Sequence, residues 1–182
     1  MLIWSILLLI LVLVGLTEFS TLRTGVPTVA SFPPSRKKIV EVLRKDRATH
    51  GEAEPYRIVD LGSGNGQLAT AIASALPDAT VTGVEISVVP WAIASLRQKI
   101  FGPRNLEFRR QSFWPYDVSN ADAVVLYLCN DVLPRISQKL RDELKPGTLV
   151  VINEIPLQGT WQPVETIETG FLKMKVYVYR QG

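Results

Sequence analysis

The sequence predicts an α/β protein with a doubly wound, mostly parallel sheet, an antiparallel C-terminal edge strand and a preceding N-terminal transmembrane helix. Three observations lead to this fold class. Short apolar runs alternate with helical patterns along most of the chain. The runs are apolar at nearly every position, which is typical of parallel strands covered by helices on both faces. A glycine-rich turn joins the first run to the helix that follows it.

The N-terminal segment is predicted to be a membrane anchor over residues 1–19. Residues 1–16 carry no charged side chain and would span about 24 Å as a helix, near the thickness of a bilayer core. A cleaved signal peptide would need a basic start and a small-residue cleavage site, and a buried core helix would show a polar face. Basic residues occur only after the segment, from Arg23 onward, which places the following domain on the cytoplasmic side.

The segment at 20–34 is predicted to be an extended linker, and the remaining residues, 35–182, a single domain. Pro27, Pro33 and Pro34 argue against a helix in the linker. Ser35 is a plausible N-cap for a first helix whose apolar residues from Ile39 to Leu43 form one stripe.

The domain itself alternates between strands and helices. Predicted strands cover residues 57–61, 80–85, 106–109, 123–128 and 148–153, and predicted helices cover 67–76, 88–100 and 133–144. From Leu172 to Tyr179 apolar and polar residues alternate, which indicates a half-buried strand, antiparallel and at the edge of the sheet.

Composition excludes several classes of function. The chain has 20 basic and 17 acidic residues, and its basic clusters are too short for a nucleic-acid footprint. With one cysteine and one histidine, neither an internal disulfide nor a Cys/His zinc site can form. We therefore expect no metal and no nucleic-acid partner.

The turn "DLGSGNG" is the strongest local signal. Asp60 ends a strand, and Gly62, Gly64 and Gly66 precede a helix whose free N–H groups favour an anion. The anion could be a pyrophosphate or a carboxylate. The dinucleotide fingerprint would place its third glycine at position 67, which is Gln67, and no P-loop lysine follows.

Two further features narrow the ligand to a nucleoside. Glu85 ends the next strand, 19 residues after Gly66, where its carboxylate could accept both hydroxyls of a ribose. Ser112 and Phe113 follow the third strand and could meet an adenine by a hydrogen bond and by stacking, whereas Trp114 is equally well explained as a packing residue.

These residues resemble a known family. "VDLGSGNG" and "GVE" look like the first two motifs of class I S-adenosylmethionine-dependent methyltransferases, which have a Rossmann-like fold. "VPTVASFPPSRKKIVEVL", "QSFWPYDVSNADAVVLYLCNDVLPRISQKLRDELKPGTLVV" and "GTWQPVE" extend the likeness to a small protein-lysine methyltransferase family. Its members include archaeal lysine methyltransferases and membrane-anchored mitochondrial enzymes that modify adenine nucleotide translocase and an ATP synthase ring subunit.

The resemblance implies S-adenosylmethionine as the cofactor. By position, Glu85 would hold the ribose, and Thr28 would lie in the segment that covers the cofactor near its methyl group. Ser112 replaces the Asp or Asn usual in the family and would hold adenine more weakly. The methionine end would be held by Asp60, Gly62, Ser63, Gly64 and Gly66.

Methyl transfer to an amine also needs a group that orients the nucleophile. Candidates after the fourth and fifth strands are Asn130, Asp131 and Glu154, although Asp131 could instead cap the helix near Leu133. "NDVLP" differs from the Asn-Pro-Pro-Tyr motif of enzymes that methylate nucleic acid bases.

The sequence therefore predicts a membrane-anchored methyltransferase that modifies a lysine of a protein, and a membrane protein is the expected substrate. Two alternatives stay open at this point. One is a methyltransferase acting on a lipid or quinone headgroup, and the other is a catalytically inactive S-adenosylmethionine-binding module. A nicotinamide-dependent enzyme is disfavoured by the glycine spacing.

Overall fold

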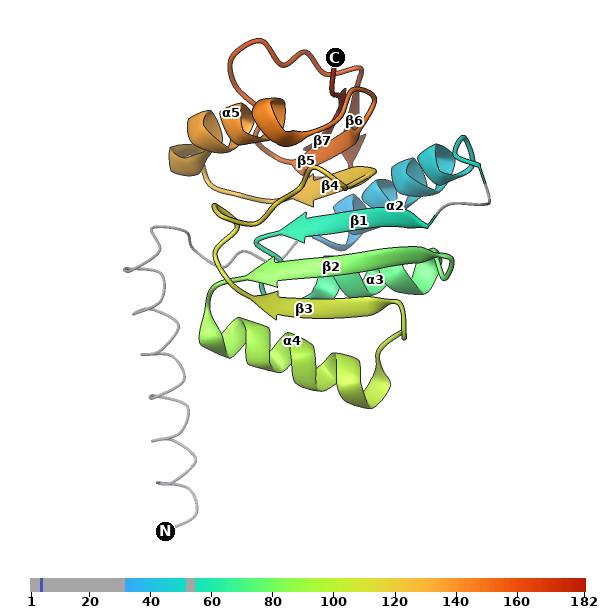
Figure 1. The fold of residues 1–182 in the computed structure, drawn as a ribbon, viewed down its shortest axis with the longest axis vertical. Coiled ribbons are helices and arrows are strands. Elements are labelled where there is room, and N and C mark those ends of the chain that lie inside the picture. Colours follow the sequence, from blue (N-terminus) through green and yellow to red (C-terminus); the bar gives the residue numbers. More distant parts are fainter. Residues whose placement is uncertain (1–3, 5–31, 52–54) are drawn as a thin grey trace.

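The computed structural model describes residues 4, 32–51 and 55–182 of the chain. Its centre is a seven-stranded sheet with the order β3-β2-β1-β4-β5-β7-β6 (Figure 1). Strands β1 to β5 are parallel, and β7 is antiparallel to both β5 and β6. The strands are β1 Tyr56–Leu61, β2 Ala79–Glu85, β3 Leu106–Arg110, β4 Ala123–Leu126, β5 Leu149–Asn153, β6 Glu165–Thr169 and β7 Met174–Arg180.

Helices cover the sheet from both sides. Helices α2 and α3 contribute to one apolar cluster with the sheet, and α5 contributes to a second cluster with the opposite face. Helix α4 packs against β3 and β2 and runs alongside them (Figure 1). The helices are α2 Pro33–Arg47, α3 Gln67–Ala75, α4 Val88–Phe101 and α5 Leu133–Glu143, with a 3₁₀ turn at Asn130–Val132. The predicted doubly wound α/β domain is thereby confirmed.

The C-terminal strand is antiparallel, as predicted, but it does not form the edge of the sheet. Strand β7 lies between β5 and β6, with Val176, Val178 and Tyr179 buried. The edge is instead β6, whose sequence "ETIET" is mostly polar and exposed, so it carries no apolar run by which it could be recognised. Leu172 lies before β7 and is exposed.

The expectation that helices cover both faces of the parallel sheet is wrong at one end. On the β2–β3 side Thr80, Glu107 and Arg109 are exposed. The Glu107 carboxylate accepts hydrogen bonds from the Thr82 hydroxyl at 3.2 Å and from Arg109 Nε at 2.8 Å. Polar side chains rather than a helix thus cover this part of the sheet.

Helix α2 begins earlier than predicted. Phe32, not Ser35, occupies the N-cap position, and Pro33 and Pro34 form the first turn, where the absence of an N–H costs nothing. Ser35 is buried, and its hydroxyl shares a 2.9 Å hydrogen bond with the Thr169 hydroxyl of β6. This bond ties the start of the helix to the far edge of the sheet.

The predicted membrane anchor lies outside the described residues except for Trp4. Across residues 4, 32–51 and 55–182, no helix has both the length and the apolar character needed to span a bilayer. The predicted linker at 20–34 is likewise described only from residue 32 onward.

Candidate functional site

The glycine turn lies where β1 ends, at the edge of the sheet formed by the carboxyl ends of the parallel strands (Figure 1). Gly62, Gly64 and Gly66 have φ values of 78°, 53° and 74°, a region that side-chain-bearing residues rarely adopt. The N–H groups of Gly62 and Ser63 donate to the Val84 carbonyl at 2.9 and 3.0 Å. The turn is therefore fastened to β2, and Gly66 caps the N-terminus of α3.

Glu85 organises this turn with its carboxylate. Its Oε2 accepts the Gly64 N–H at 2.9 Å, and its Oε1 accepts the Ser87 N–H at 2.6 Å. The residue is 7% exposed, so these bonds lie in a shielded environment. Each carboxylate oxygen keeps a further lone pair, so the group can still accept hydroxyl donors from a ligand.

Asp60 is buried beside Glu85. Burial is the main cause that raises the pKa of Asp60 from 3.8 to about 7, and the charge of Glu85 raises it further. A hydrogen bond that Asp60 accepts from the Ala69 N–H acts in the opposite direction. Its Oδ2 is buried and has no hydrogen-bond partner. A buried acceptor of this kind at a strand end is a site for a donor group of a ligand.

The raised pKa of Asp60 makes stability depend on pH. Between pH 3.8 and about 7 the folded chain keeps a proton on Asp60 that the unfolded chain has released. The contribution of Asp60 to stability is fully present below this window and is lost as the pH rises through it, with a limiting slope of about 1.4 kcal/mol per pH unit. We expect urea unfolding between pH 4.5 and 7.5 to show this loss, and Asp60→Asn to remove it. If the free energy of unfolding changed with pH in the same way in both proteins, the raised pKa of Asp60 would be contradicted.

The predicted adenine contacts lie in the segment after β3. The Ser112 hydroxyl accepts the Trp114 N–H at 3.2 Å and keeps its own proton for another acceptor. Phe113 is buried in the apolar cluster of the α5 face. Trp114 packs at 4.8 Å, between ring centroids, from Phe113, and the Arg135 guanidinium lies 4.1 Å over the Trp114 ring. Trp114 is therefore a packing residue, while the roles of Ser112 and Phe113 stay predictions.

The catalytic candidates follow β4 and β5. Asn130 and Asp131 are exposed in the 3₁₀ turn, and helix α5 begins without a side-chain cap, so Asp131 does not cap it. Glu154 follows β5 with a φ of 70°, a strained value for a residue with a side chain. Its Oε1 accepts the Lys175 N–H at 3.1 Å, which fixes the carboxylate against β7.

Two residues in the same region were not anticipated from the sequence. Asn153 ends β5 and is fully buried, yet both its amide nitrogen and its amide oxygen lack a hydrogen-bond partner. Tyr127 follows β4, and burial together with the charge of Glu154 raises the pKa of its phenol. Asn153 could have been noticed as an amide at the end of an apolar run, whereas Tyr127 looks like an ordinary strand residue.

The remaining predicted site residue, Thr28, lies outside the described residues. Within residues 4, 32–51 and 55–182, no group of three or more His, Cys, Asp or Glu side chains is arranged to hold a metal ion.

The residues present fit S-adenosylmethionine. The left-handed backbone of Gly62, Gly64 and Gly66 bends the chain sharply from β1 into α3, whose N-terminal N–H groups favour an anionic group of a ligand. The Glu85 carboxylate is suited to the two ribose hydroxyls, and the unpaired Oδ2 of Asp60 offers an acceptor beside them. These groups belong to adjacent strands, β1 and β2, as a nucleoside site at a sheet edge requires.

Comparisons with known proteins show that the chain is similar to methyltransferases. Over 162 residues the chain is 30% identical to a protein-lysine N-methyltransferase of Saccharolobus islandicus (strain REY15A), covering 86% of this chain and 96% of that protein. It is 28% identical over 159 residues to adenine nucleotide translocase lysine N-methyltransferase of Mus musculus, covering 86% of this chain and 64% of that protein. A solved RNA methyltransferase from Salinibacter ruber in complex with S-adenosyl-L-homocysteine has a TM-score of 0.72 and 26% identity, covering 84% of this chain and 94% of that one.

The family described as the ANTKMT methyltransferase domain matches residues 60–165, from Asp60 of the glycine turn to the start of β6. The match includes Glu85 and the strand ends that carry Asn153 and Glu154. It extends over more than half of the chain, which therefore belongs to the ANTKMT methyltransferase family.

Proposed function

We propose that this chain uses S-adenosylmethionine to methylate the side-chain amine of a lysine in a membrane-associated protein. The observation that carries the proposal is the similarity to the Saccharolobus islandicus protein-lysine N-methyltransferase, which extends over nearly the whole length of that protein. The Mus musculus relative, whose name gives adenine nucleotide translocase as its substrate, supports a lysine in a protein as the acceptor.

Residues 1–19, of which the first sixteen carry no charge, support a site of action at a membrane. We propose that they anchor the chain and that the domain from residue 35 onward lies on the cytoplasmic side, because basic residues follow the segment from Arg23 onward. An anchor would raise the local concentration of a membrane-bound substrate without any additional contact.

Methyl transfer to a lysine requires that this chain's residues position the amine and accept a proton from it. Bound S-adenosylmethionine supplies a methyl group already activated on a sulfonium, so the protein mainly positions the nucleophile and excludes water. A lysine amine has a pKa of about 10.4 in water and must lose a proton before it can attack. The nitrogen then forms a bond to the methyl carbon as the sulfur–carbon bond breaks, and a second amine proton leaves afterward.

Glu154 is the candidate best placed to accept an amine proton. Its backbone is held in a strained conformation, and its Oε1 accepts a hydrogen bond from the backbone N–H of Lys175. Its Oε2 is therefore available to a substrate. The buried amide of Asn153 and the phenol of Tyr127 lie beside it at the ends of β5 and β4. Asn130 and Asp131 would orient the substrate from the neighbouring exposed turn.

We expect Glu154→Gln to lower the rate of methyl transfer at pH 7 by about 100-fold, because it removes a carboxylate that accepts a proton. The rate should recover toward wild type near pH 9.5, where more of the lysine is already neutral. The rates are measured at both pH values by quenching the reaction at set times and counting the methyl groups transferred. Glu165→Gln, at the exposed start of β6, is the matched control and should keep the wild-type rate. Equal loss at both pH values would contradict a role in deprotonation.

The proposed function can be tested directly. The full chain is incubated with S-adenosylmethionine labelled in its methyl group and with membranes from cells that lack the endogenous enzyme. Label recovered as methyl-lysine after hydrolysis of the protein fraction supports the proposal, with Glu85→Ala as the inactive control. Label found in the lipid extract alone would overturn it.

A further inference from the structure

Helix α4 presents its large apolar side chains to solvent. Its buried residues are small or cyclic, Pro90 and Ala94, and Trp91 is half-buried with its Nε1 donating to the Phe108 carbonyl at 3.2 Å. A helix on the surface of a soluble domain normally turns its large apolar residues toward the core. In α4 this arrangement is inverted.

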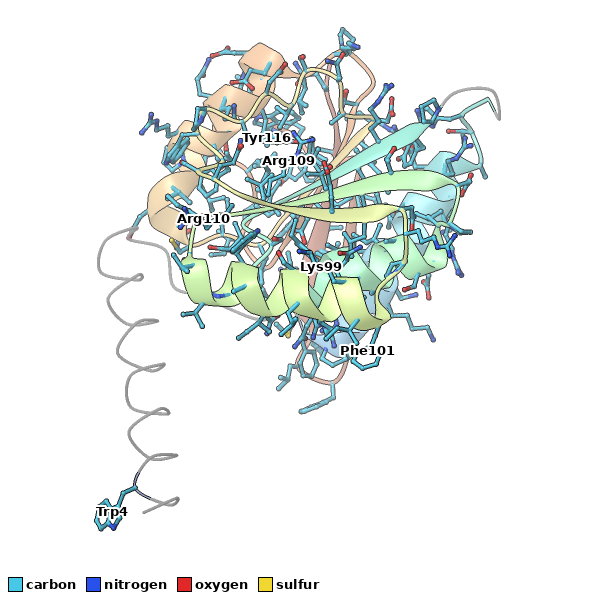
Figure 2. The ribbon with its side chains drawn as sticks, turned by 60° about the horizontal axis from the view of Figure 1, so that its bottom comes forward. Trp4, Lys99, Phe101, Arg109, Arg110 and Tyr116 are labelled. Atoms are coloured by element: carbon cyan, nitrogen blue, oxygen red, sulfur yellow. The ribbon has the colours of Figure 1, made fainter. Side chains whose placement is uncertain are left out.

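The exposed residues form a continuous ridge, which we call the α4 ridge. Ile93, Leu96 and Ile100 are spaced by three and four residues and so lie on one face of the helix. Figure 2 shows Phe101 projecting at the end of the helix. Residues of the ridge are between 50% and 85% exposed, and they are Val88, Ile93, Leu96, Ile100 and Phe101.

The charges on α4 and in the loop that follows it have one sign. Residues 86–106 contain Arg97, Lys99 and Arg104 and no carboxylate. Lys99 and Arg104 are exposed, and Figure 2 shows Lys99 on the same helix as Phe101. Arg97 instead donates to the Asn65 carbonyl at 2.6 Å, so it belongs to the glycine turn.

We propose that the α4 ridge docks onto the surface of a lipid bilayer that contains anionic lipids. A helix with exposed large apolar side chains flanked by Lys and Arg is suited to lie in the headgroup region, with its cations near lipid phosphates. A second copy of the chain is a poor occupant of the ridge, because a two-fold contact through α4 would bring two sets of cations together and α4 itself has no carboxylate to pair with them. A ridge, unlike a groove, offers no recess for a peptide.

Docking through α4 orients the methyltransferase site. The helix begins at Val88, three residues after Glu85, so one end of the ridge lies at the cofactor edge of the sheet. With α4 in the plane of the membrane, the strands run parallel to the surface, because α4 runs alongside β3 and β2 (Figure 1). The site then opens at the level of the headgroups. This inference does not depend on lysine being the acceptor.

The test measures where the ridge lies when the full chain is bound to vesicles. A nitroxide is attached at Leu96→Cys in a Cys129→Ser background, and the reference label is placed at Gln138→Cys, an exposed position of α5 on the other face. Vesicles contain phosphatidylcholine with or without phosphatidylserine. We expect the label at 96 to collide more with oxygen and less with an aqueous nickel chelate than the label at 138. Both labelled positions are exposed, and Cys129→Ser exchanges a half-buried thiol for a hydroxyl of similar size, so the fold should be kept.

Removing the two exposed cations beside the α4 ridge provides a second test. Lys99→Gln with Arg104→Gln should shift the label at 96 toward water, with docking weakened about fivefold per cation on vesicles that contain phosphatidylserine. The proposal would be overturned if the nickel chelate reached the label at 96 as readily as the label at 138. This holds even if the N-terminal segment keeps the chain on the vesicle. Spin–spin broadening at 96, which reports a second copy on the ridge, or failure of the chain to bind vesicles, would overturn it as well.

Discussion

Glu85→Ala should lower the affinity for S-adenosylhomocysteine by about 100-fold or more while the chain still folds. Hydrogen bonds to a charged group contribute about 1.5–3 kcal/mol each, and the proposed ribose contact has two of them, so the loss is about 3 kcal/mol or more. The substitution also leaves the Gly64 and Ser87 N–H groups without their acceptor, which loosens the turn that should meet the ligand. Titration calorimetry measures the affinity, and cooperative urea unfolding measures whether the fold survives.

Two further variants separate the effect of Glu85 from a general loss of charge. Glu107→Ala removes an exposed carboxylate from the neighbouring strand β3 and should leave the affinity unchanged. Glu85→Gln keeps an oxygen that can accept one backbone N–H, so it should preserve part of the turn and still lose most of the affinity. Wild-type affinity in Glu85→Ala would refute the ribose assignment, whatever its effect on stability.

The central parallel strands, β4 and β5, could be predicted from the sequence because they are buried on both faces. A run such as "LVVI" is apolar throughout, and the structure places β5 over it, at Leu149–Asn153. The glycine turn was equally predictable, since Gly62, Gly64 and Gly66 all have the positive φ that only glycine adopts readily. Each of these two features depends on residues that are close together in the sequence, so the sequence alone is enough to predict it.

The features that were missed depend on neighbours in the fold. Strand β6 is recognised only through its pairing with β7, because Glu165 and Glu168 give it no apolar pattern. Asn153 is the polar last residue of a predicted strand, and its burial depends on what packs around the end of β5. The exposure of α4 likewise could not be read from its sequence, since an apolar helix is ordinarily expected to be covered.

Gly66→Ala should destabilise the fold by about 2–5 kcal/mol, the sum of about 1–2 for a left-handed backbone and about 1–3 for overpacking. Gly66 has a φ of 74°, and a Cβ there would lie 2.3 Å from Cζ of the Phe108 ring and 3.0 Å from Cβ of Ala94. Neither neighbour can withdraw easily, because the Phe108 ring also lies against Gly83 of β2 and Ala94 is fully buried. Equilibrium urea unfolding followed by circular dichroism measures the loss.

Two other glycines separate the contributions. Gly147 has a φ of 87° and open space around its missing Cβ, so Gly147→Ala should cost only the backbone part, about 1–2 kcal/mol. Gly83 lacks a positive φ, but its Cβ would lie 2.5 Å from the Phe108 ring, so Gly83→Ala should cost the packing part, about 1–3 kcal/mol. Adding Phe108→Leu should then relieve much of the cost of Gly83→Ala, less of the cost of Gly66→Ala and none of the cost of Gly147→Ala. If all three alanine variants were equally destabilised, close approach to Phe108 would not be the reason for glycine at position 66, and the turn would be shaped by its backbone conformation alone.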